Sequence, residues 1–118
     1  MIHLISYGAR KRSKPACDLS YDVRRWCHVN PHALFGKRID GRDARVIQWM
    51  MQRPDMGYFV SDMAEEIAGK YVDGGKKKLT VAICCSWGHH RSVAVVELLK
   101  LMVAAAGPVV VTHLELGT

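Results

Sequence analysis

Residues 85–92, with the sequence CSWGHHRS, combine side chains with which proteins bind phosphate. They follow an apolar run rich in β-branched residues at 79–84 and precede an apolar pattern typical of a helix at 93–106. A loop between a strand and a helix offers the unpaired amides and the positive dipole end of that helix. The segment therefore predicts an anion site, and the alternative is a tight connection that binds nothing.

Within this loop, Arg91 supplies a planar charged fork for two phosphate oxygens, and Gly88 permits a turn that directs backbone amides inward. Hydroxyl and imidazole groups add further hydrogen-bond donors. The candidate ligand-binding residues of the loop are Cys85, Ser86, Trp87, Gly88, His89, His90, Arg91 and Ser92.

Cys85 and Arg91 also have the C-x5-R-S spacing that is typical of cysteine-dependent phosphatases. In that chemistry a thiolate attacks phosphorus while loop amides and the arginine hold the equatorial oxygens. A general acid is needed too, and the candidates are Asp22, Asp40 and Asp43. The alternative interpretation of Cys85, which we favour, is a small buried residue at the end of a strand.

Metal binding is a third interpretation of the cysteines and histidines, but their spacings match no zinc ribbon or finger. We expect neither a metal nor a cofactor. The N-terminus has no signal-peptide pattern, and the apolar stretch at 93–106 contains Glu97 and Lys100 and is too short to span a bilayer. We therefore expect a cytoplasmic protein with no membrane partner. In that compartment free thiols are expected for Cys17, Cys27, Cys84 and Cys85.

The elements that must position this loop follow from the hydrophobic pattern. The chain has 118 residues, of which 49% are hydrophobic and 24% charged, as in one folded domain over 1–118. Strands are expected at 1–7, 19–26, 79–84 and 108–112. Helices are expected after Asp43, around 59–71 and at 93–106, with a loop through residues 30–32. Strand, loop, helix and strand form a βαβ unit, so we predict an α/β domain with a mainly parallel central sheet flanked by helices.

The net charge of +6 favours partners that carry phosphate, either nucleic acid or small anions. Two basic runs are candidate RNA contacts, and tryptophans such as Trp26 and Trp49 could stack on unpaired bases. The alternative is charge runs that are only solvated, because no compact RNA-reading motif is present. The candidate RNA-binding residues are Arg10, Lys11, Arg12, Lys14, Lys76, Lys77 and Lys78.

Several elements together resemble one known family. Residues 79–93, with the sequence LTVAICCSWGHHRSV, resemble the C-terminal domain of RapZ, the RNase adapter protein. Residues 21–24 (YDVR) and 30–32 (NPH) resemble that family's D-V-R and N-P-H elements, and 41–43 (GRD) and 113–115 (HLE) are weaker matches. The elements occur in the family's order and cover nearly the whole chain.

The resemblance implies an α/β domain that binds a phosphorylated amino sugar, glucosamine-6-phosphate, and a small regulatory RNA that it presents to a ribonuclease. On this resemblance the ligand pocket involves His32 together with the loop, and Asp22 and Arg24 lie beside it. Free phosphate or sulfate, another protein partner and a second copy of the chain remain open as partners. No G-x-x-x-x-G-K-[ST] motif occurs, so ATP or GTP binding is not expected.

This chain departs from the family's pattern in three ways. Cys84 and Trp87 stand where the family typically has glycine, and the segment between Val23 and Asn30 is about two residues longer. Trp87 is the departure that bears on the ligand, because it lies inside the loop and either narrows the pocket or offers a stacking face.

Overall fold

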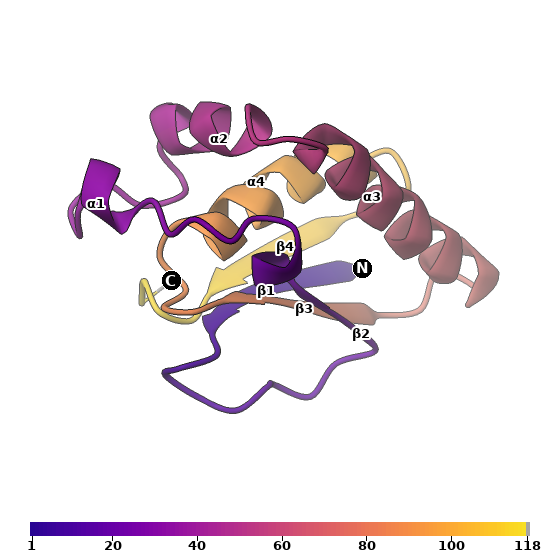
Figure 1. Ribbon diagram of the computed structural model, residues 1–118. Coiled ribbons are helices and arrows are strands. Elements are labelled where there is room, and N and C mark those ends of the chain that lie inside the picture. Colours follow the sequence, from indigo (N-terminus) through magenta and orange to yellow (C-terminus); the bar gives the residue numbers. More distant parts are fainter. Residues whose placement is uncertain (118) are drawn as a thin grey trace.

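A computed structural model describes residues 1–117 and contains one parallel β-sheet (Figure 1). The strands are β1 (Ile2–Gly8), β2 (Leu19–Asp22), β3 (Leu79–Cys85) and β4 (Val109–His113). Their order across the sheet is β2-β3-β1-β4, and every neighbouring pair is parallel. The predicted α/β class with a parallel sheet is confirmed.

The helices are η1 (Val23–Arg25), α1 (His32–Phe35), α2 (Ala44–Met51), α3 (Met56–Asp73) and α4 (Arg91–Val103). As expected, Asp43 caps α2, and its carboxylate accepts a hydrogen bond from the Arg45 amide at 2.8 Å. Pro54 lies between α2 and α3. Figure 1 shows α2, α3 and α4 on one face of the sheet, whereas the connection 9–18 crosses the opposite face.

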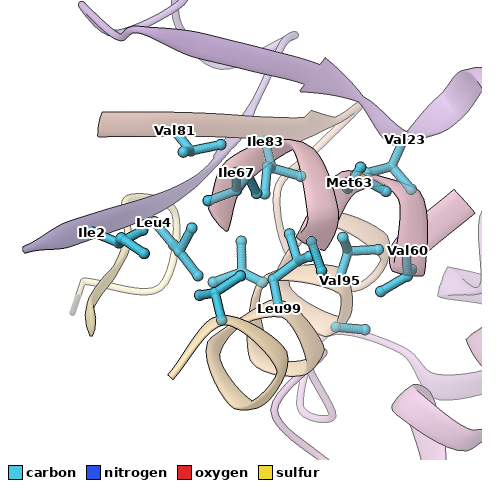
Figure 2. Packing of buried hydrophobic residues seen from close by; sticks show 14 of the residues in the cluster. Ile2, Leu4, Val23, Val60, Met63, Ile67, Val81, Ile83, Val95 and Leu99 are labelled. Atoms are coloured by element: carbon cyan, nitrogen blue, oxygen red, sulfur yellow. The ribbon is translucent and has the colours of Figure 1, made fainter. Parts of the chain in front are cut away.

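The core lies between the sheet and the helices (Figure 2). Ile2 and Leu4 of β1 point toward the same layer as Val81 and Ile83 of β3, because alternate residues of a strand share a face. α3 and α4 fill this layer from the helix side, for example with Leu99, which is fully buried. The opposite face has a small cluster of its own, formed by Tyr7, Ala82, Cys84, Cys17 and Leu114.

Three boundaries differ from the sequence expectation. The second strand ends at Asp22, because the Asp22 carboxylate accepts the Arg24 amide and turns the backbone into η1. The expected loop at 30–32 leads into the short helix α1 instead. The last helix begins at Arg91 and ends at Val103, so Arg91 and Ser92 belong to the first turn of α4.

The loops that follow β1 and β3 begin side by side at the carboxyl edge of the sheet, because the two strands are parallel neighbours. The connection from β1 runs to β2 at one edge of the sheet, whereas β3 continues through α4 to β4 at the other edge. Both connections leave the sheet at the carboxyl ends of these neighbouring parallel strands, which is the edge where α/β sheets bind their ligands.

Candidate phosphate-binding site

The loops after β1 and β3 are held together by their backbones. The Ala9 amide donates to the Cys85 carbonyl at 2.9 Å, and the Arg10 amide donates to the Ser86 carbonyl at 3.0 Å. Gly8 has no room for a side chain, since a Cβ atom would lie 2.6 Å from the Trp87 carbonyl carbon. Gly88 adopts φ +74°, a left-handed conformation that favours glycine. Both glycines therefore fix the path of the loop.

The connection 9–12 is further tied down by Glu115, which follows β4. Glu115 Oε2 accepts the Gly8 amide at 3.0 Å and Arg12 Nε at 2.8 Å. Partial burial opposes the charge of Glu115, but the hydrogen bonds from Arg12 and Gly8 outweigh it and keep the pKa below its usual range. This places the basic side chains of the connection beside the loop.

The segment 36–41 closes the site from the other side. The Gly41 amide donates to the His89 carbonyl at 2.8 Å, and a Cβ atom on Gly41 would lie 2.3 Å from the His90 carbonyl oxygen. His90 is buried, and its Nε2 donates to the Gly36 carbonyl at 2.8 Å. One role of His90 is therefore to orient this segment.

Cys84 and Cys85 face opposite sides of β3, as expected for adjacent strand residues. Cys85 is 3% exposed, and its Sγ accepts the Gly88 amide at 3.3 Å and lies 3.2 Å from Ser92 Oγ. Cys84 instead packs against Tyr7, and burial raises the pKa of the Cys84 thiol. All four cysteines are free thiols, which confirms the prediction.

Arg91 is a buried cation whose hydrogen bonds are incomplete. Its side chain is 3% exposed; Nη1 donates to the Cys27 carbonyl at 2.8 Å, and Nη2 lies 3.5 Å from Ser86 Oγ. Nε is fully buried and has no hydrogen-bond partner. Within residues 1–117, no carboxylate forms an ion pair with Arg91. Buried charges in proteins are normally paired, so the site favours an anion.

A cavity of about 420 Å³ opens beside the loop. Its wall carries ammonium, imidazole, amide and indole groups and no carboxylate. The lining residues are Lys11, Asn30, His32, Lys37, Trp87, His89 and His90. Burial, together with the electrostatic effect of the neighbouring His90 and Lys11, lowers the pKa of His89. The wall is thus suited to an anionic ligand.

The structure brings most of the predicted ligand residues together. His32, Trp87, His89 and His90 line the cavity, and Cys85, Ser86, Gly88, Arg91 and Ser92 form the strand end, the turn and the helix start beside it. Asp22 and Arg24 do not line the cavity. They pair with each other instead, with 2.8 Å between Arg24 Nη2 and Asp22 Oδ2.

The three candidate general acids are each bound to an arginine. Asp22 pairs with Arg24, Asp40 with Arg42 and Asp43 with Arg45, and none of the three aspartates lines the cavity. The hydrogen bond from Arg24 holds the pKa of Asp22 below its usual range, so this carboxyl is a poor proton donor.

The two basic runs lie at opposite ends of the sheet. Residues 10–14 follow β1 and lie at the carboxyl edge, where Lys11 lines the cavity and Lys14 is exposed. Residues 76–78 precede β3 and therefore lie at the amino edge. A partner bound over the cavity would meet the first run and not the second.

Sequence reasoning did not single out Lys37 and Asn30 as lining residues, and it placed Lys11 with RNA alone. Asn30 accepts the His32 amide on its Oδ1 at 3.1 Å, and Lys37 follows Gly36, whose φ is +67°. The local signals for these two residues were the Asn-Pro pair, which is typical of a turn, and the glycine that directly precedes Lys37.

Within residues 1–117, no helix has the length and the apolar character needed to cross a membrane. No three side chains of the His, Cys, Asp and Glu types come close enough in that range to hold a metal ion.

Comparison with known proteins gives a consistent result. A family model described as the RapZ C-terminal domain matches residues 1–117. A nucleotide-binding protein from Geobacter sulfurreducens is 37% identical over 117 residues, covering 95% of this chain and 40% of the relative. One from Lactobacillus acidophilus is 33% identical, covering 98% of this chain and 40% of the relative, and one from Bordetella petrii is 38% identical, covering 89% and 37%. The chain thus spans about two fifths of the length of these relatives.

Proposed function

This chain belongs to the RapZ C-terminal domain family, and we propose that it is a binding module for a phosphorylated metabolite, held where β3 leads into α4. The family resemblance suggests an amino-sugar phosphate as the ligand. The proposal further assigns an RNA contact to the basic connection 10–14. The relatives are named nucleotide-binding proteins, but the phosphate-loop motif G-x-x-x-x-G-K-[ST] is absent here, so no nucleotide site of that type is proposed.

The observation that carries the proposal is the buried guanidinium of Arg91. A cation that has lost its water and has no carboxylate partner is costly, and an incoming phosphate would supply both charge and acceptors. The cavity wall supports this, because His32, His89, Lys11 and Lys37 all carry donors and no lining group is acidic.

Isothermal titration with glucosamine-6-phosphate and with inorganic phosphate tests the metabolite site. Arg91→Ala is expected to weaken binding about 100-fold, because a desolvated charged contact is lost. Arg45→Ala is the matched control, since it removes the same charge from a surface ion pair with Asp43. Equal affinities of Arg91→Ala and the parent protein would refute the site, and circular dichroism shows whether each variant is folded.

The RNA contact is tested by gel-shift titration of a small structured RNA. Replacement of Lys11 and Lys14 by glutamine is expected to weaken binding and to lower its salt dependence, because phosphate contacts release counterions. Replacement of Lys76, Lys77 and Lys78 at the opposite edge is the control and is expected to have a smaller effect. If the three-lysine variant loses more affinity, RNA binds at the amino edge and this part of the proposal fails.

One observation favours a second candidate function, a cysteine-dependent phosphatase. Cys85 Sγ accepts the Gly88 amide and lies close to Ser92 Oγ, and both groups would stabilise a thiolate. The test is turnover of p-nitrophenyl phosphate by the parent protein and by Cys85→Ser. Turnover that disappears in the variant supports an enzyme, and no turnover between pH 5 and pH 8 removes this candidate.

A further inference from the structure

Trp87 is the feature of the cavity that phosphate binding leaves unexplained. Its side chain is 46% exposed, which is unusual for an indole, and it forms part of the cavity wall. A cavity of about 420 Å³ is also far larger than a single phosphate group needs and falls in the range of small organic ligands. The rest of the ligand therefore has space next to an aromatic ring.

The backbone of Trp87 is held in place by contacts within the protein. Its carbonyl packs against Gly8, where no Cβ atom fits, and the next residue, Gly88, is held against the backbone of Tyr7 and Gly8. The two residues before Trp87 are held as well, because the amides of Ala9 and Arg10 donate to the carbonyls of Cys85 and Ser86. Because its backbone is anchored, a ligand that stacks on the indole does not have to order the loop.

The charges around the indole narrow the chemistry of the ligand. Arg10 Cζ lies 5.8 Å and Lys11 Nζ 5.9 Å from the ring centroid, within the range of cation–π contacts. The remaining wall adds Lys37 and three histidines, and no carboxylate lines the cavity. An ammonium group on the ligand would find no counter-charge in this wall, whereas an uncharged planar ring would find a stacking surface.

We propose that the cavity takes a nucleoside monophosphate, with the phosphate at the loop beside Arg91 and the base stacked on Trp87. This inference rests on the proposed phosphate site and specifies the remainder of its ligand. It departs from the amino sugar that the family resemblance suggests. Trp87 is then the residue that determines specificity.

Isothermal titration with adenosine 5′-monophosphate, ribose 5-phosphate, adenosine and glucosamine-6-phosphate tests this. The first two ligands share the phosphate and the sugar and differ in the base. We expect the mononucleotide to bind about tenfold more tightly than ribose 5-phosphate and more tightly than glucosamine-6-phosphate. Trp87→Ala is expected to abolish that tenfold difference, because it weakens binding of the mononucleotide far more than binding of ribose 5-phosphate, and Trp87→Phe is expected to retain most of it.

The outcomes separate this inference from the proposed function. Equal binding of the mononucleotide and ribose 5-phosphate, a difference that survives Trp87→Ala, or tighter binding of glucosamine-6-phosphate each overturns the nucleotide assignment and leaves the phosphate site standing. Adenosine binding as tightly as its monophosphate overturns the phosphate site. No binding of any phosphate-bearing ligand overturns both.

Discussion

Two buried polar side chains, His113 beside α4 and Arg91 in its first turn, have opposite surroundings. His113, at the end of β4, is 3% exposed, and both of its ring nitrogens are bonded: Nδ1 lies 2.6 Å from Ser6 Oγ, and Nε2 lies 2.9 Å from Glu97 Oε2. Because a carboxylate only accepts, Nε2 carries a proton, and Nδ1 shares the second hydrogen bond with the Ser6 hydroxyl. Arg91 is equally buried, but its Nε has no partner and no carboxylate of the described chain neutralises its charge.

The difference distinguishes a polar group that serves the fold from one that serves a ligand. The Ser6–His113–Glu97 network is complete within the protein, so removal of one member leaves other buried groups unpaired. Arg91 is costly in the free protein, and an anion would remove that cost. The core between the sheet and the helices consists of apolar side chains. The polar groups suited to binding a ligand therefore lie at the carboxyl edge of the sheet.

The largest effect on stability is expected from breaking the complete network. His113→Leu leaves the Ser6 hydroxyl and the Glu97 carboxylate without their partner, so the free energy of unfolding should fall by about 2–4 kcal/mol. Urea denaturation measures this. A loss below about 0.5 kcal/mol would mean that the network does not stabilise the fold and that the contrast with Arg91 has no energetic basis.

A smaller effect is expected at the contact between the two loops. Gly8→Ala places a methyl group 2.6 Å from the Trp87 carbonyl carbon, and only movement of the backbone can relieve that overlap. We expect a loss of about 1–3 kcal/mol in unfolding free energy, together with weaker phosphate binding. Gly69→Ala is the control, since a Cβ atom there meets nothing within 4 Å. Unchanged phosphate affinity in a folded Gly8→Ala protein would show that this contact does not shape the site.

The smallest predicted effect is the pH dependence of phosphate binding. In the free protein, burial and the electrostatic effect of the neighbouring His90 and Lys11 lower the pKa of His89, so its ring is mostly neutral at pH 7. A bound phosphate favours the protonated ring and raises that pKa, so binding takes up a proton. Affinity should therefore rise a few-fold as the pH falls from 8 toward 6.5, and His89→Gln should flatten the titration profile. Affinity that rises with increasing pH would contradict the assignment.

Local patterns sufficed for the βαβ unit around the loop, because a continuous buried strand, a glycine turn and a long apolar helix each have a clear signature. They also grouped Trp87, His89 and His90 in one loop, whereas His32 was assigned to the same pocket only on the family resemblance. Long-range partners left no such signature. The Cys27 carbonyl that accepts from Arg91 is 64 positions away in the sequence. Asp22 binds Arg24 and does not face the loop, because the backbone turns into η1 directly after Asp22. Lys37 lines the cavity, and Gly41 in the same segment packs against the start of α4, a contact between residues far apart in the sequence.

The central claim is that the buried charge of Arg91 is held for an anion, and one comparison tests it most directly. The free energy of unfolding is measured for the parent protein and for Arg91→Met, with inorganic phosphate and with chloride at equal ionic strength. Without phosphate, Arg91→Met should lose less than about 2 kcal/mol, because removal of an unpaired buried charge offsets the lost contact to Cys27. Phosphate at a hundred times its dissociation constant should stabilise the parent protein by about 2.7 kcal/mol and leave the variant unchanged. Equal stabilisation of both proteins, or of neither, would contradict the claim.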